Sequence, residues 1–287
     1  MGRALYDGSA VARAVFDEAD EALGFALSRL CFEGPEDALQ STANTQPAIL
    51  THSIAALADL RARSPERLDG AAFAAGHSLG EYSACVASGA LRFADAVRLV
   101  RRRGELMQEA VPAGVGAMAA IIGLAAVDVE AACREAAGDE VVSAANYNSP
   151  EQTVIAGHAA AVDRASAACL ARGAKRALRL PVSAPFHSAL MRPARERMEE
   201  LLRKTDFADS EVPVVTNVDA EPASSGDVLR DSLVRQIDSP VRWVESVRRI
   251  AALGVDRALE IGPGNVLAGL VRRIEKTIRV EGVSGPA

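Results

Sequence analysis

The feature that most constrains this chain is a G-x-S-x-G pentapeptide, GHSLG (76–80), set between an apolar run and a helical pattern. Residues 71–75 form a short apolar run bounded by glycine, which predicts a buried strand. A strand followed by this turn and a helix predicts a nucleophile elbow, which holds Ser78 at a helix N-terminus where backbone N–H groups stabilise an oxyanion. A glycine-rich turn with a capping serine has the same letters, so the flanking strand and helix carry the prediction.

The rest of the chain alternates helical and strand patterns. Residues 9–30 place apolar side chains at helical spacing, and Thr45-Gln46-Pro47 predicts the start of a second helix that runs to about Leu60. Short apolar runs at 212–216 and 258–261 predict further buried strands. The chain is therefore predicted to be an α/β protein with a parallel sheet.

Residues 113–183 follow a different rhythm. The patterns predict, in order, a strand at 116–123, a helix at 127–137, strands at 141–145 and 153–156, a helix at 160–172 and a strand at 175–182. The order βαββαβ is that of a ferredoxin-like unit. We expect it to be a subdomain inserted at 113–183 into a hydrolase-like α/β domain formed by 1–112 and 184–287.

A serine nucleophile needs a base, and the chain has four histidines. His77 adjoins Ser78 and would point away from it on an elbow. His52 falls within a predicted helix as a satisfied, partly buried residue, and His158 follows a strand as a surface or turn residue. His187 lies in PFHS (185–188), at the junction after the inserted unit, where a loop can face the cleft. This position favours His187 and leaves a structural role for it open.

Composition excludes several classes of protein. A net charge of −6 argues against broad nucleic-acid binding, and no apolar run reaches the roughly 18 residues of a membrane span. The histidines lack metal-ligand spacing. No secretory segment opens the chain, so the four cysteines are expected to be reduced thiols in a cytoplasmic protein: Cys31, Cys85, Cys133 and Cys169.

Five stretches occur together in one order: TQPA (45–48), GHSLGEYSA (76–84), Arg103-Gly104 with Met107, PFHSALM (185–191) and GPGNVL (262–267). With the βαββαβ insertion they cover nearly the whole chain, which resembles the malonyl-CoA:acyl-carrier-protein transacylases of fatty-acid or polyketide synthesis. The resemblance implies malonyl transfer from malonyl-CoA to the phosphopantetheine thiol of acyl carrier protein, through a malonyl-serine enzyme. It also implies a monomer without a cofactor, and leaves the pathway open.

The resemblance assigns roles residue by residue. Ser78 matches the acylated nucleophile and His187 the general base. Gln236 matches the residue whose backbone carbonyl orients that histidine, in place of an aspartate. The N–H of Leu79 matches one oxyanion donor. A thioester is an activated acyl group, so a Ser–His pair without a carboxylate is chemically sufficient.

Further residues match the substrate side. Arg103 matches the guanidinium that pairs with the malonyl carboxylate, which suits its planar fork. Met107 and Phe186 match the acyl pocket, with Phe186 resembling the bulky residue associated with malonyl over methylmalonyl selectivity. Lys175 and Arg176 fall in the segment expected to meet the acidic carrier protein, although both also fit ordinary solvated charges. Arg101 and Arg102 directly precede Arg103, in a stretch expected to be helical, and are expected to be solvated.

One departure from the family concerns the start. The family begins with a strand and a loop of the type FPGQGSQ, which supplies a second oxyanion donor, whereas Met1 to Leu5 resemble the stretch just after that loop. We therefore expect the first strand and that donor to be missing and activity to suffer. Two alternatives stay open: a non-catalytic homologue that binds carrier protein or CoA, and a serine esterase. Esterases usually place histidine near the C-terminus, whereas 100 residues follow His187.

Overall fold

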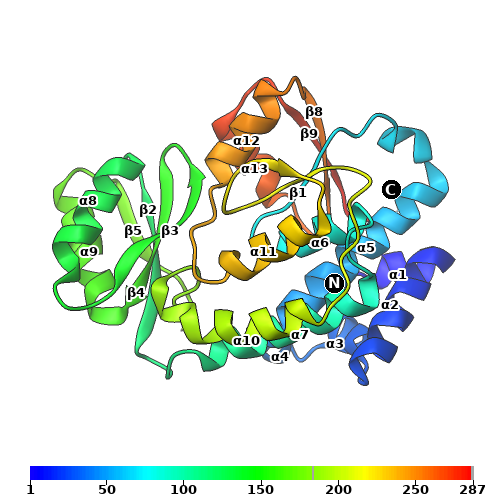
Figure 1. The fold of residues 1–287 in the computed structure, drawn as a ribbon, viewed down its shortest axis with the longest axis horizontal. Helices are drawn as coiled ribbons and strands as arrows, with labels where there is room; N and C mark the ends of the chain where they lie inside the picture. The colour runs from blue at the N-terminus through cyan, green and yellow to red at the C-terminus, as the bar shows by residue number, and fades with distance from the viewer. Residues whose placement is uncertain (183, 286–287) are drawn as a thin grey trace.

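The computed structural model describes residues 1–182 and 184–285. Its helices are α1 (Arg3–Gly8), α2 (Ala10–Leu23), α3 (Leu27–Glu33), α4 (Glu36–Gln40), α5 (Thr42–Arg63), α6 (Leu79–Ala87), α7 (Phe93–Glu109), α8 (Ala126–Ala137), α9 (Ala159–Ala171), α10 (Arg192–Arg203), α11 (Gly226–Gln236), α12 (Trp243–Ala252) and α13 (Val266–Ile274). Its strands are β1 (Ala74–Ala75), β2 (Gly116–Ile122), β3 (Val142–Ser149), β4 (Gln152–His158), β5 (Arg176–Arg179), β6 (Val214–Val215), β7 (Pro222–Ala223), β8 (Arg257–Ile261) and β9 (Arg279–Val283). In Figure 1 the unit built from β2 to β5, α8 and α9 lies at one end of the long axis, and α1 to α3 lie toward the other.

The inserted unit has the predicted topology. Its four-stranded antiparallel sheet has the order β3-β4-β2-β5, which is ferredoxin-like, with α8 and α9 on one face. Residues of β2 alternate between faces, because Ala119 and Ile121 pack against the helices and Met118 packs on the opposite side with Phe186. The fold class is therefore confirmed. The limits at 112/113 and 183/184 stay predictions, and residue 183 lies outside the described residues.

The parallel strands of the larger part fall into two sheets among the described residues. β1 and β6 are shorter than the strands predicted at 71–75 and 212–216, whereas β8 covers the strand predicted at 258–261. β1 pairs in parallel with β6, which pairs with β7, whereas β8 pairs in parallel with β9. Ala75 of β1 and Ala258 of β8 pack against one apolar cluster that includes Val241 and Trp243. Val241 also exchanges backbone hydrogen bonds with β3, which ties the inserted unit to this core.

The helix predicted at 9–30 is in fact two helices. α2 ends at Leu23, and Gly24 takes a left-handed φ of 71° while its N–H donates to the Asp20 carbonyl. A glycine in this conformation is a common helix stop. Asp20 also accepts from the Ser28 N–H in the first turn of α3, which fixes the angle between the two helices.

The second helix, α5, starts at Thr42, three residues before the predicted start, and contains Pro47. Proline lacks the N–H that would bind the carbonyl four residues earlier, which belongs to Ala43. The Arg101 guanidinium donates to that carbonyl over 3.3 Å. Arg101 is therefore half-buried and bonded to α5, which corrects the prediction that it is solvated. Arg102 is more exposed and pairs with Glu105.

A close crossing of α5 and α7 builds the floor of the site. A Cβ at Gly104 would lie 2.6 Å from the Ala43 Cα, so only glycine permits this approach. The crossing brings Arg103 of α7 beside Gln46 of α5. Among the described residues, no helix combines the length and apolar character that a membrane crossing needs.

Candidate active site

Ser78 occupies a strained turn between β1 and α6. Its φ of 52° and ψ of −105° lie in a sparsely populated region that surrounding structure must enforce. A Cβ at Gly76 would lie 2.0 Å from the Gly80 carbonyl, so the strand and helix approach closely only because this position lacks a side chain. The predicted nucleophile elbow is present.

Asn217, which is distant in the chain, stabilises this elbow through two hydrogen bonds. Its side-chain oxygen accepts the Ser78 N–H at 2.7 Å, and its side-chain amide donates to the Gly76 carbonyl at 2.7 Å. Asn217 is not among the site residues predicted from the sequence. Its position just after the strand predicted at 212–216 was a usable signal, because ligand sites of α/β folds lie at the carboxyl ends of parallel strands.

His187 lies directly against the nucleophile. Its Nε2 is 2.7 Å from the Ser78 Oγ, and its Nδ1 is 2.8 Å from the Gln236 backbone carbonyl oxygen. A carbonyl oxygen only accepts, so the proton sits on Nδ1, and Nε2 is free to accept the Ser78 hydroxyl proton. His187 has a φ of 58°, a second strained residue at the same place.

The electrostatic surroundings keep His187 neutral. Burial and the positive charge of Arg103 lower its pKa to about 3. Of the other histidines, His77 bonds to Asn148 through Nε2, away from the nucleophile, as predicted. His158 accepts a hydrogen bond from the Val141 N–H. His52 is buried, and its Nδ1 has no hydrogen-bond partner in the described residues, so the prediction that its polar atoms are satisfied is wrong. Its burial lowers its pKa to about 4.

Arg103 is 2% exposed and reaches the nucleophile itself. Its Nη2 donates to the Ser78 Oγ at 3.0 Å and to the Gln236 side-chain oxygen at 2.9 Å. Its Nη1 donates to the Gln46 side-chain oxygen at 2.8 Å. All three acceptors are neutral, and Nε has no partner within the described chain. The site therefore holds a buried cation beside a serine hydroxyl. The hydrogen-bond acceptors of this cation are neutral, and its nearby negative group is the buried Glu81.

The remaining predicted pocket residues adjoin these groups in the chain. Leu79 is the first residue of α6, so its N–H has no acceptor within the helix and stays available to an oxyanion. Met107 lies one turn after Arg103 and is buried, and Phe186 is half-buried immediately before His187. Lys175 and Arg176, by contrast, are exposed at the start of β5, the edge strand of the inserted sheet.

Two further residues at the site were missed. Gln46 occurs in the TQPA stretch, but nothing in the sequence indicated its contact with Arg103. Glu81 lies three residues after Ser78 and is fully buried, which is rare for a carboxylate unless it is hydrogen-bonded. It accepts from the Asn217 N–H and from the Gln236 side-chain amide.

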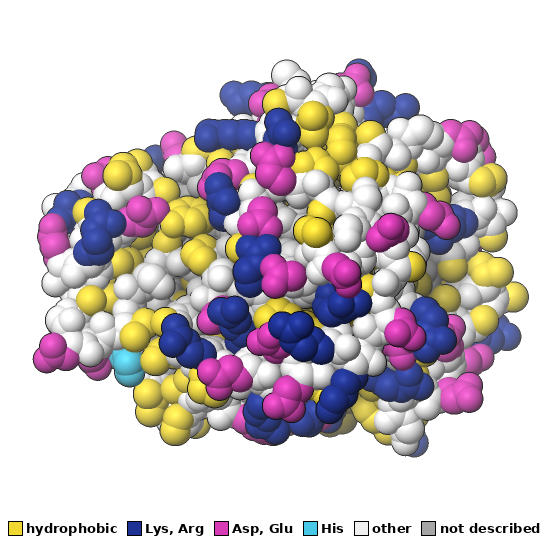
Figure 2. Space-filling model, viewed as in Figure 1, with side chains coloured by type: hydrophobic (Ala, Val, Ile, Leu, Met, Phe, Trp, Pro, Cys, Tyr) yellow, Lys and Arg dark blue, Asp and Glu magenta, His cyan; other side chains and the backbone are white. Residues whose placement is uncertain are grey.

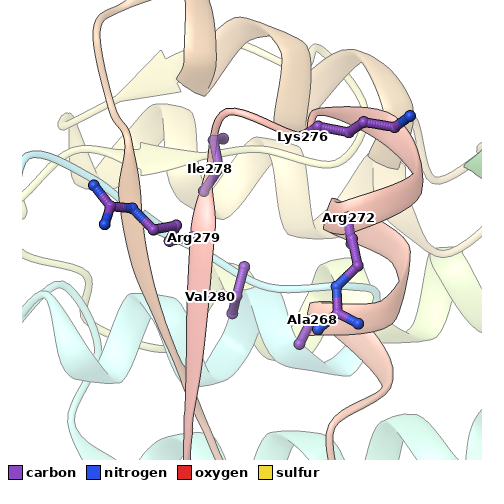
Figure 3. A pocket seen from close by; sticks show the side chains of 6 residues that line it. All are labelled: Ala268, Arg272, Lys276, Ile278, Arg279 and Val280. Carbon is purple, nitrogen blue, oxygen red and sulfur yellow. The ribbon is translucent and has the colours of Figure 1, made fainter.

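Two surface cavities lie apart from these residues. One, of about 230 Å³, lies between α13 and β9, and Arg272, Lys276 and Arg279 are among the side chains that line it (Figure 3). The other, of about 330 Å³, lies between α10 and α11. Neither includes Ser78 or Arg103.

Among the described residues, neither the cysteines nor the potential metal ligands form a further site. All four cysteines are free and buried. Across residues 1–182 and 184–285, no group of three or more His, Cys, Asp or Glu side chains is arranged to hold a metal ion.

The elbow, the Ser–His pair and the inserted ferredoxin-like unit define a serine-dependent acyl-transfer protein. The chain belongs to the acyl transferase domain family, which matches residues 1–285. It is 52% identical over 272 residues to the malonyl CoA-acyl carrier protein transacylase of Escherichia coli K12, covering 95% of this chain and 87% of the relative. The corresponding enzyme of Bacillus subtilis is 47% identical over 289 residues, covering 100% and 89%.

Solved structures agree. The structure of an acyl carrier protein S-malonyltransferase from Vibrio cholerae superposes with a TM-score of 0.95 at 46% identity, covering 100% of this chain and 92% of that one. A malonyl-transacylase in complex with a type II polyketide-synthase acyl-carrier protein gives the same TM-score, identity and coverage.

Proposed function

We propose that this protein transfers a malonyl group from malonyl-CoA to the phosphopantetheine thiol of an acyl carrier protein, through a malonyl ester on Ser78. The relatives with these names support the substrates. The observation that carries the proposal is the Arg103 guanidinium, 3.0 Å from the Ser78 Oγ, which itself lies 2.7 Å from the His187 Nε2. A buried cation beside an acyl nucleophile suits an acyl group that carries its own carboxylate.

The first half-reaction loads the enzyme. The His187 Nε2 takes the Ser78 proton as Oγ attacks the thioester carbonyl, and the Leu79 N–H donates to the resulting oxyanion. The carbon–sulfur bond then breaks, and the His187 proton passes to the departing CoA thiolate. The Gln236 carbonyl stabilises the intermediate imidazolium, because its contact with Nδ1 is already made.

The second half-reaction reverses these roles. His187 takes the proton of the phosphopantetheine thiol, whose sulfur attacks the malonyl ester carbonyl. The ester carbon–oxygen bond breaks, and the proton returns to the Ser78 Oγ. The chemistry balances with these groups alone, so we propose that no metal or cofactor takes part.

Arg103 selects the acyl group in this proposal. A carboxylate is a stronger acceptor than the amide oxygens of Gln46 and Gln236, and it accepts from a guanidinium in a planar fork. Malonyl binding therefore gives the guanidinium a charged acceptor, whereas the acceptors it has in the free enzyme are all neutral. The carboxylate of the bound malonyl group also offsets the positive charge of Arg103, which with burial lowers the His187 pKa. His187 is therefore a stronger base when the substrate is bound.

The carrier protein is proposed to dock on the face that includes Lys175 and Arg176. Figure 2 shows basic and acidic side chains interspersed over one face of the molecule. On that face an acidic partner is attracted by a small group of basic side chains, because the face as a whole is not basic. We further propose a cytoplasmic monomer that does not bind nucleic acid. These points follow from charge and resemblance.

The test is transfer itself. The protein is mixed with malonyl-CoA and a holo acyl carrier protein, and malonyl-carrier protein is followed by mass spectrometry over many turnovers. The proposal expects turnover with the parent and none with Ser78→Ala. Binding of carrier protein without transfer would favour the non-catalytic alternative, and release of free malonate in place of transfer would favour an esterase.

A further inference from the structure

The buried Glu81 is a charged group that the proposed mechanism does not use. It lies in the first turn of α6, three residues after the nucleophile, and is 0% exposed. Both carboxylate oxygens are occupied. Oε2 accepts from the Asn217 N–H at 3.1 Å and from the Gln236 Nε2 at 2.7 Å, while Oε1 accepts from the Ser232 hydroxyl at 3.0 Å.

The two residues on Oε2 are those that hold the reacting groups. Asn217 fixes the elbow through the Ser78 N–H and the Gly76 carbonyl. Gln236 makes three contacts with the site: its backbone carbonyl with His187, its side-chain oxygen with Arg103, and its Nε2 with the Ser78 carbonyl at 2.9 Å. The Glu81 Oε2 therefore accepts hydrogen bonds from both residues that position the nucleophile, the base and the guanidinium.

The orientation of the Gln236 amide depends on this contact. An amide group can flip, exchanging its oxygen and its nitrogen. An acceptor at Glu81 and a donor at Arg103 are compatible with only one orientation, in which the nitrogen faces Glu81 and the oxygen faces Arg103. A flipped amide would set its NH₂ against the guanidinium and its oxygen against the carboxylate.

We infer that Glu81 is a positioning residue for acyl transfer: its Oε2 holds Asn217 and the Gln236 amide, and through them fixes Ser78, His187 and Arg103 in one arrangement. The inference rests on the proposed function. What matters in it is an acceptor at the Oε2 position. Burial raises the pKa of Glu81 to about 7, so a neutral form is accessible. With its proton on Oε1, facing the Ser232 hydroxyl, this form keeps the acceptor at Oε2.

Two substitutions at position 81 differ in whether an acceptor stays at the Oε2 position. Glu81→Gln keeps the length of the side chain, so its oxygen can replace Oε2 and its amide can donate to Ser232. Glu81→Asp keeps the charge but withdraws the carboxylate by one methylene from both donors. Ser232→Ala removes only the partner of Oε1 and leaves Asn217 and Gln236 in place.

The experiment measures single-turnover acylation of Ser78 by malonyl-CoA, per folded molecule, in the parent and the three variants. Folded fractions come from thermal melts. We expect Glu81→Asp to be slower by about tenfold to several hundredfold, since small misplacements of reacting groups have effects of this size. The acylation rate of Glu81→Gln should stay within about threefold of the parent rate, and that of Ser232→Ala should be close to the parent rate. The malonyl-to-acetyl preference should fall in Glu81→Asp, because Arg103 loses its alignment.

A second probe keeps this inference distinct from the proposed function. Phenylmethylsulfonyl fluoride sulfonylates an activated serine, with fluoride leaving, and it requires only the Ser78–His187 pair. The same order of variants should appear with this probe even if malonyl-CoA proves not to be the substrate. The inference is overturned if Glu81→Asp reacts as fast as the parent with both reagents, or if Glu81→Gln is as slow as Glu81→Asp, since charge or bulk would then decide.

Discussion

Replacing Arg103 with alanine tests how the acyl group is selected. The guanidinium is 2% exposed and contacts two side-chain amides and the Ser78 Oγ, so a malonyl carboxylate bound there is desolvated. Losing one partner of such a pair costs about 2–5 kcal/mol. At about 1.4 kcal/mol per factor of ten, malonyl acylation should slow by about thirtyfold to several thousandfold.

Acetyl-CoA provides the internal comparison, because it has no carboxylate. Removing Arg103 also removes a positive charge that lowers the His187 pKa, so the base becomes stronger in the variant. Acetyl transfer should therefore fall much less than malonyl transfer, or rise. Single-turnover acylation by the two thioesters measures both, with Arg102→Ala, on the exposed side of the same helix, as the matched control. An equal loss for both acyl groups would refute the selection argument and make Arg103 structural.

Three further predictions follow from the same geometry. Because the pKa of His187 is about 3, malonyl acylation should keep its rate between pH 8 and pH 5, and an acid limb centred near 6.5 in the rate profile would show that the base is exposed or is another residue. Phe186→Ser should raise methylmalonyl relative to malonyl acylation by widening the space beside His187, and an unchanged ratio would remove Phe186 from the acyl pocket. Reversing Lys175 and Arg176 to glutamate should raise the KM for carrier protein severalfold without changing acylation by malonyl-CoA, and an unchanged KM would mean that the two charges are only solvated.

The parts of the fold that the sequence predicted are those where local pattern and tertiary structure agree. The strands of 113–183 are short apolar runs set between helical patterns, and their order permits few topologies. The elbow was predictable because Gly76 and Gly80 flank a serine between a strand and a helix. Its close contact needs a glycine at position 76, and this requirement is visible in the letters.

The two errors in helix limits have different causes. Pro47 predicted a helix start, yet the helix begins at Thr42, and Arg101, more than fifty residues later, donates to the Ala43 carbonyl that proline leaves without its helical partner. That contact lies outside any short window of sequence. Gly24 is a local stop signal, and the prediction missed it because the apolar spacing continues past it.

The candidate site shows the same division. Ser78, Arg103 and His187 occur in recognisable stretches, and the structure brings them within hydrogen-bonding distance. Asn217 and Glu81, which hold this group together, are separated by 136 residues in the chain. Their importance comes from burial and shared partners, which depend on the packed structure.

The central claim is that Ser78 carries the malonyl group during transfer, and intact-mass analysis tests it most directly. The protein is mixed with malonyl-CoA in the absence of carrier protein, quenched in acid and weighed, and the modified peptide is sequenced by fragmentation. The account predicts one malonyl adduct per chain, located on Ser78, absent from Ser78→Ala and slower to form by about a hundredfold or more in His187→Ala. A malonyl adduct that persists in Ser78→Ala, or an unmodified parent that still transfers malonyl groups to carrier protein, would contradict it.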